Sequence, residues 1–154
     1  MRAKLQSPKV PTRADIVAAA LRWIGTPYHH QAAARGVGCD CLGLVRGVWR
    51  EVYGAEPEAP PPYSPDWGEA GKAEHILDAA RRNMRELSPG EAQPGDVLVF
   101  RMVECRIAKH MAIVAYDRTM IHAVSRDGVR RVPLDAGWLR RAVAAFAFPG
   151  IENT

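Results

Sequence analysis

The hydrophobic spacing of the chain changes once, near residue 93, and this change constrains the fold more than any other feature. Before it, apolar residues recur every three or four positions, which is typical of amphipathic helices. After it come short segments rich in β-branched residues, which are typical of strands. A turn-forming stretch, Gln93–Asp96 (QPGD), marks the change. Helices followed by strands predict an α+β domain in which N-terminal helices pack on a C-terminal antiparallel sheet.

Two helices are expected in the first half of the chain. The first begins at Thr12, whose side chain can form a capping box with Asp15, and the run ends at Gly25. A loop over residues 26–38 follows, because proline and glycine interrupt the pattern. The second helix covers about 41–53 and carries one apolar stripe.

Glycines mark both the interior and the end of this second helix. Gly54 is expected to stop it. Gly43 and Gly47 lower its helix propensity, so another element is expected to pack closely at these two positions.

The remaining elements are expected from chain breakers and from β-branched runs. The proline-rich stretch over residues 55–67 predicts a rigid connection, and a third helix is expected over about Glu69 to Leu87. A hairpin turn is expected at Asp127–Gly128. Strands are expected over Val97–Val103, His110–Ala115, Thr119–Val124, Val129–Val132 and Arg141–Phe148.

Length and composition exclude several classes of protein. The 154 residues predict one domain over 1–154, with a core at about 12–150. No apolar run approaches the roughly 20 residues that span a bilayer, and residues 1–14 lack the apolar segment of a secretory signal. The net charge of +4 comes with basic pairs scattered along the chain, so no nucleic-acid partner is expected. Three cysteines are too few for a disulfide framework.

Cys41 is the candidate nucleophile. It stands in the first turn of the second helix, where free N–H groups and the helix dipole stabilise a thiolate. The apolar stripe places it on the face that should pack against the sheet, where a base could reach it. The alternative is that Cys41 is an ordinary buried core residue.

His110 is the candidate base, and His122 in the next strand is the candidate orienting group. Their relation depends on the length of the connecting turn, because side chains alternate between the two faces of a sheet. A two-residue turn at 117–118 would place the two histidines on opposite faces. A three-residue turn at 116–118 would place both on one face. Two unrelated histidines remain the alternative.

A zinc site is a competing hypothesis. Cys39, Cys41, Cys105 and His110 are ligand types that zinc accepts. However, a Cys-x-Cys pair is closer than the usual ligand spacing, and no second compact pair exists. No metal ligand and no cofactor are therefore assigned.

Several ordered motifs resemble the NlpC-type cell-wall peptidases, which are compact papain-like cysteine peptidases. The matches between residues 12 and 125 are the segments Gly25–Tyr28, Asp40–Val45, Gln93–Asp96, His110–Ile113 and Met120–Ala123. The resemblance implies a papain-like fold and hydrolysis of peptidoglycan stem peptides, with the bond between D-glutamate and diaminopimelate as the expected target. The short length is most similar to members encoded in phage tail modules and gene transfer agents.

The resemblance also implies roles for individual residues. Cys41 would be the nucleophile, His110 the base and His122 the orienting residue. Tyr28 would line the site, and Asp40 would help to recognise the substrate amine. Leu42 stands where the family usually has a serine that helps to hold this amine. The aromatic-Gly-Gly usual after the Pro-Tyr pair is also replaced, by residues 29–32 (HHQA).

The expected setting follows from these points. Such a protein would be made in the cytoplasm without a signal peptide and would act in the cell wall or periplasm as part of a phage-like particle, with tail or baseplate proteins as partners. One alternative is an inactive tail or wall-binding component of the same fold. The other is the small zinc module.

Overall fold

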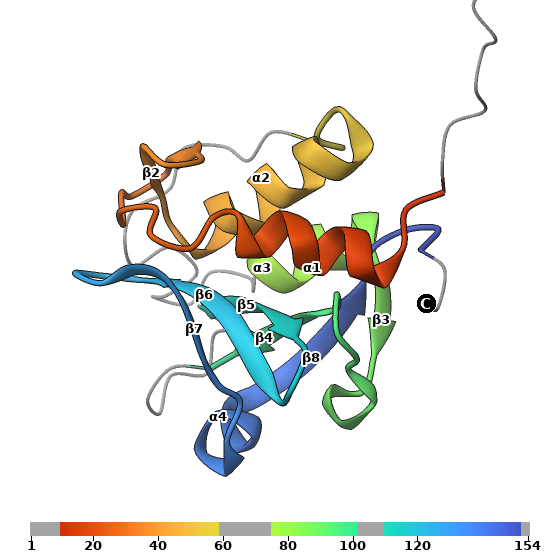
Figure 1. Cartoon of the computed structure of the whole chain (residues 1–154). Helices are drawn as coiled ribbons and strands as arrows, with labels where there is room; N and C mark the ends of the chain where they lie inside the picture. The colour runs from red at the N-terminus through yellow and green to blue at the C-terminus, as the bar shows by residue number, and fades with distance from the viewer. Residues whose placement is uncertain (1–9, 59–74, 102–109, 152–154) are drawn as a thin grey trace, which may run out of the picture.

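The structure is a computed structural model that describes residues 10–58, 75–101 and 110–151. In Figure 1, α1 and α2 lie on one side of a twisted sheet and α4 lies on the other. The helices are α1 (Arg13–Leu21), α2 (Cys41–Tyr53), α3 (His75–Asn83) and α4 (Ala136–Arg141), with a 3-10 turn, η1, at Pro89–Glu91. The strands are β1 (Ala33–Ala34), β2 (Gly38–Cys39), β3 (Arg85–Leu87), β4 (Val97–Phe100), β5 (His110–Ala115), β6 (Thr119–Val124), β7 (Gly128–Pro133) and β8 (Ala142–Ala147).

Six strands form the main sheet, in the order β3-β8-β4-β5-β6-β7, and every neighbouring pair is antiparallel. The predicted α+β architecture is therefore confirmed. The sheet separates two apolar clusters. The larger lies under α1 and α2 and includes Trp23, Leu44, Val48, Ile113 and Phe146. The smaller lies on the side of α4 and includes Leu98, Phe100, Met120 and Trp138.

The first helix begins as predicted but ends early. Thr12 and Asp15 form the reciprocal capping box. The helix ends at Leu21 rather than at Gly25, because the next residues turn toward β7. There the Gly25 N–H donates to the Val129 carbonyl at 3.0 Å, which replaces a helical hydrogen bond.

The second helix has the predicted bounds, and its glycines have the predicted packing role. A Cβ on Gly43 would lie 1.8 Å from the carbonyl oxygen of Ala32, and one on Gly47 would lie 2.0 Å from the Trp23 ring. The helix ends at Gly54, whose φ of 89° is readily adopted only by glycine.

Two elements differ from the prediction because tertiary pairing overrides local spacing. The third helix ends at Asn83, and Arg85–Leu87 forms a strand that pairs with β8. The strand predicted from Arg141 begins one residue later, because Arg141 ends the short helix α4, which was not predicted. This helix is capped where the Asp135 side chain accepts from the Trp138 N–H at 3.0 Å. Residues 69–74 of the predicted third helix lie outside the described residues.

The predicted strands are otherwise found, with small changes. Strands β5 and β6 have the predicted bounds. The described part of β4 ends at Phe100, and residues 102–103 of the prediction lie outside the described residues. The turn before β7 is 125–127 rather than Asp127–Gly128, because Gly128 already pairs with Val124.

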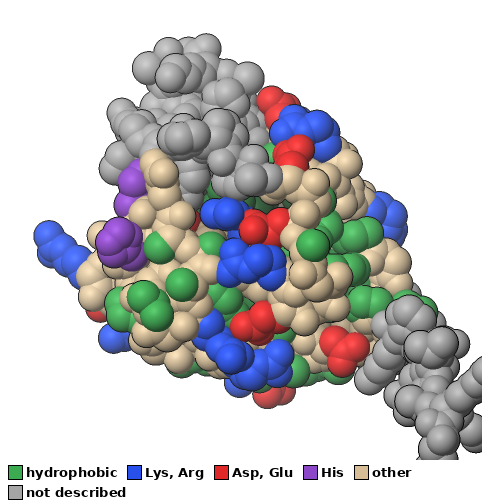
Figure 2. Space-filling view, turned by 90° about the horizontal axis from the view of Figure 1, so that it is seen from above, with side chains coloured by type: hydrophobic (Ala, Val, Ile, Leu, Met, Phe, Trp, Pro, Cys, Tyr) green, Lys and Arg blue, Asp and Glu red, His purple; other side chains and the backbone are tan. Residues whose placement is uncertain are grey.

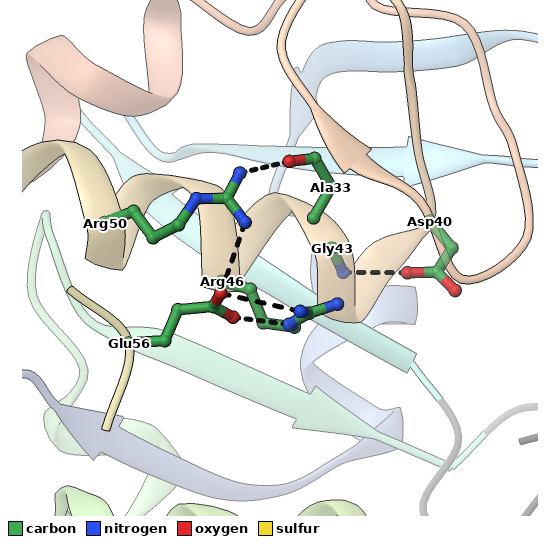
Figure 3. A network of polar contacts seen from close by, with 6 residues as sticks. All are labelled: Ala33, Asp40, Gly43, Arg46, Arg50 and Glu56. Atoms are coloured by element: carbon green, nitrogen blue, oxygen red, sulfur yellow. Dashed lines mark hydrogen bonds and ion pairs between the residues drawn. The ribbon is translucent and has the colours of Figure 1, made fainter. Parts of the chain in front are cut away.

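Charged side chains join the helices to the rest of the fold. At the start of α1, Arg13 Nη1 lies 2.6 Å from Asp96 Oδ1, and both side chains are buried. On α2, Arg46 and Arg50 both bind the carboxylate of Glu56, and Arg50 also donates to the carbonyl of Ala33 (Figure 3). Residue 56 is thus fixed to α2, whereas residues 59–67 of the proline-rich stretch lie outside the described residues.

The helical face carries both signs of charge side by side (Figure 2). Glu51, for example, pairs with Arg22 at 3.5 Å and with Arg35 at 3.4 Å. Exposed pairs of this kind contribute at most about 1 kcal/mol each. Among the described helices, none is long and apolar enough to cross a bilayer.

Candidate active site

Cys41 is the first residue of α2, and its thiol lies against the start of β5. Its side chain is buried, with 9% exposed. The backbone N–H groups of Met111, Leu42 and Cys41 itself lie around the sulfur and act to lower the pKa of the thiol. Since Met111 follows His110, the thiol lies beside the peptide unit that joins these two residues. The structure thus places Cys41 in the first turn of the second helix, on the side that packs against the sheet, which is the position expected from the sequence.

The protonation state of this thiol differs from the expectation. Burial, and to a lesser extent the nearby carboxylate of Asp40, raise the pKa of Cys41 to about 12. The three backbone N–H groups act in the opposite direction but do not compensate. The helix N-terminus therefore does not produce a standing thiolate here, because desolvation is the larger effect. Cys41 is a neutral thiol at pH 7 in this arrangement.

The two histidines meet on one face of the sheet. Ala115 pairs with Thr119, so the turn between β5 and β6 contains three residues, 116–118. This odd number is the one that brings both histidines to the same face. His110 Nε2 lies 2.9 Å from His122 Nδ1. His122 is buried, with 4% exposed, whereas His110 is partly exposed.

Two aromatic side chains pack around this pair. The centre of the Trp138 ring on α4 lies 5.9 Å from the centre of the His110 ring and 5.3 Å from that of the His122 ring. Phe100 on β4 lies 6.0 Å from the His110 ring and 5.1 Å from the Trp138 ring. Sequence reasoning missed Trp138, because its helix was not predicted. The one available signal was Asp135, a cap residue three positions before it.

The surroundings keep both imidazoles neutral. Burial and the neighbouring His122 lower the pKa of His110 to about 3, and burial lowers that of His122 to about 4. If His110 Nε2 donates its hydrogen to His122 Nδ1, the Nδ1 atom of His110 keeps a free lone pair. That tautomer can accept a proton from a thiol.

The loop before α2 brings Asp40 and Tyr28 close to the thiol. Asp40 caps α2 by accepting from the Gly43 N–H at 2.7 Å (Figure 3), and its second oxygen accepts from the Gln31 N–H at 2.8 Å. Its carboxylate thus holds the loop on the helix. Burial is the largest cause that raises the pKa of Tyr28 to about 12, and its closeness to Cys41 and Asp40 contributes to this rise.

Leu42 and Cys39 are both packed into the protein interior. Leu42 is half-buried against the larger apolar cluster. Because this residue is a leucine and not a serine, its side chain offers the substrate no hydroxyl. Cys39 is fully buried in β2. Within residues 10–58, 75–101 and 110–151, no three His, Cys, Asp or Glu side chains gather as a metal site would require. Cys105 of the zinc hypothesis lies outside these ranges.

Comparisons with known proteins define the class. The model of the NlpC/P60 family matches residues 25–146, and the chain belongs to this family. Over 125 residues it is 31% identical to a probable endopeptidase of Mycobacterium tuberculosis and to one of Mycobacterium bovis. These matches cover 80% of this chain and 27% of each relative, so the chain spans about a quarter of the length of these proteins.

Solved structures agree on the fold. The NlpC/p60 domain of the peptidoglycan hydrolase SagA superposes with a TM-score of 0.63 at 24% identity, covering 89% of this chain and 99% of that one. An NlpC/P60 family protein of Bacillus cereus superposes with a TM-score of 0.66 at 19% identity, covering 92% and 42%. At these identities the likeness concerns the fold alone.

Proposed function

We propose that this protein is a cysteine peptidase that hydrolyses amide bonds in the stem peptides of peptidoglycan. The observation that carries the proposal is the hydrogen-bonded pair of His110 and His122 at the strand whose first peptide unit contacts the Cys41 thiol. Membership of the NlpC/P60 family supports it, as do relatives named probable endopeptidase and a structural neighbour named peptidoglycan hydrolase.

The reaction would begin from a neutral thiol and a neutral imidazole. His110 takes the proton of Cys41 as the sulfur attacks the amide carbonyl, and a C–S bond forms. The backbone N–H groups at the start of α2 stabilise the resulting oxyanion. His110 then gives the proton to the leaving amine, and the C–N bond breaks. In the second half, His110 activates a water that hydrolyses the thioester and restores the thiol.

The finer assignments are part of the proposal and rest on the motifs. The bond between D-glutamate and diaminopimelate is the proposed target, with Tyr28, Asp40 and Leu42 lining the substrate site. The proposed setting is a phage-like tail that delivers the enzyme to the cell wall. Purified phage-like particles should then contain the protein, and finding it only outside such particles would contradict this setting.

Digestion of defined muropeptides, followed by mass analysis of the products, tests the activity and the bond together. The wild type should release fragments cut after D-glutamate, and Cys41→Ala should reduce the rate by at least about 10³-fold. Cys39→Ala is the matched control, because this cysteine is also buried but two residues away from the nucleophile. Equal rates for the wild type and Cys41→Ala would refute the proposal. Absence of cleavage by the folded wild type would favour a wall-binding component instead.

A further inference from the structure

Trp138 is the only described aromatic residue whose ring contacts both histidines and also lies on the side of the sheet away from α2. Its ring meets that of His122 edge-on, at 89°, and lies tilted by 32° to that of His110. Edge-on contacts of this kind fix the relative orientation of two rings. The indole therefore packs against both imidazoles, whose facing nitrogens lie 2.9 Å apart.

The helix that carries Trp138 is capped at its start, and the indole ring has contacts with Arg141 and Phe100. The backbone N–H of Trp138 donates to the Asp135 side chain at 3.0 Å, which fixes the start of α4. The guanidinium of Arg141, at the end of the same helix, lies 5.5 Å from the centre of the indole ring. Phe100 supports the ring from β4.

We propose that Trp138 is a positioning residue for the histidine pair, which excludes water from the His110–His122 hydrogen bond and holds the two rings in the orientation that leaves His110 free to act as base. Its effect on catalysis rests on the proposed function. Its effect on the histidines themselves does not, because their protonation can be measured without any substrate.

The expected consequence is a change in the proton affinity of the pair. Without the indole, water reaches the imidazoles and stabilises their charged forms, so the pKa of both should rise toward the ordinary value. The charged groups around the pair would remain. Arg130 on β7 pairs directly across from His122, and Arg141 lies on α4. Both are cations that oppose protonation of the histidines, and Cys41 on α2 is neutral. A rise in the pKa values of the histidines would therefore show that water has gained access to them.

Three variants separate positioning from packing. Trp138→Ala removes the ring, and Trp138→Phe keeps a flat ring of smaller area. Leu139→Ala is the control, because Leu139 lies next in α4 but is exposed and outside the described contacts of the histidines. The imidazole nitrogens of His110 and His122 are followed by NMR between pH 8 and pH 5, with assignment by single histidine substitutions. Muropeptide cleavage is measured over the same range.

In the wild type and in Leu139→Ala, neither histidine should titrate above pH 5. In Trp138→Ala both pKa values should rise toward the ordinary value of about 6.5, so that both histidines titrate between pH 8 and pH 5. The acidic limb of kcat should move upward with them, so that kcat falls about fourfold at pH 6 and more steeply toward pH 5 relative to its value at pH 8, while KM changes less than about twofold. Trp138→Phe should restore most of both properties.

Unchanged titration in Trp138→Ala would overturn the proposal, even if stability or activity fell, because Trp138 would then only fill space. If Trp138→Ala does not fold, the NMR titration of the two histidines in Trp138→Phe provides the test instead. A partial rise in the pKa values supports positioning, and values identical to the wild type with a lower kcat contradict it. If the wild type cleaves no muropeptide, the proposed peptidase fails while the NMR titration still tests the role of Trp138.

Discussion

The Cys41 thiol shows how a single residue can be correctly placed and yet have an unexpected charge. Its raised pKa, about 12, predicts slow alkylation, because only the thiolate reacts. We expect the rate of Cys41 alkylation by iodoacetamide at pH 7.5 to be at least about 100-fold lower in the folded protein than in 8 M urea. Mass analysis of the peptide that contains Cys41 measures both rates. Equal rates would mean that the thiol is exposed or ionised in the folded state.

At the same scale, the sequence was sufficient to assign Cys41, His110 and His122 to their helix and strands. It was not sufficient to predict how deeply these side chains are buried. Cys41 was predictable because helix starts have clear signals, and the histidine pair followed from strand parity once the turn length was known. The neutral state of these groups was not predictable. It depends on burial by residues distant in the chain, such as Trp138 beside the two histidines, and local spacing cannot reveal such contacts.

Between elements, the buried pair of Arg13 and Asp96 joins the start of α1 to the start of β4. Arg13→Ala would leave the carboxylate of Asp96 buried without its cation, so the free energy of unfolding should fall by about 3–5 kcal/mol in urea denaturation. Adding Asp96→Asn to Arg13→Ala should recover at least half of this loss, because an amide is cheaper to bury than a charge.

The matched control for this pair is Arg22→Ala. Arg22 is about half exposed and pairs with Glu51 at 3.5 Å, so its removal should change the free energy of unfolding by less than about 1 kcal/mol. A similar loss for Arg13→Ala and Arg22→Ala would show that burial does not strengthen the Arg13 pair.

The predictions of secondary structure were wrong at two places beside β8, which are the end of the third helix and the residues of α4. Helical spacing continued through Leu87, but the free edge of β8 pairs with Arg85–Leu87 and draws these residues into a strand. In α4, Gly137 and the short length concealed the helix, although Asp135 supplies an ordinary cap. Both errors lie at the periphery of the sheet. The second helix and the central strands β5 and β6, which have strong periodicity, were predicted to the residue.

For the molecule as a whole, the neutral histidines predict a loss of stability in acid. Their pKa values are lowered in the folded state, to about 3 and 4, from an ordinary value of 6.5. Above pH 6.5 both states bind no proton there, so stability is unaffected. As the pH falls below 6.5 the unfolded chain gains protons that the folded chain does not, and the free energy of unfolding falls.

Urea denaturation at pH 7.5 and pH 5 measures this effect. The loss should amount to about 1–2 kcal/mol for each histidine at pH 5, and His122→Asn should show a smaller difference between the two pH values than the wild type. His29→Asn is the control, because this histidine lies in the exposed loop before α2. An identical pH difference in His122→Asn and the wild type would contradict the assignment.

The three-residue turn between β5 and β6 has a consequence for how such a chain can change by insertion and deletion. Its tip is exposed, and a substitution there would leave the partners of both strands in register. Loss of one residue is different, because it would move every later side chain of β6 to the other face and carry His122 away from His110. The length of this exposed turn is therefore constrained to steps of two, and its composition is limited separately by the left-handed backbone of Asp117 and Arg118.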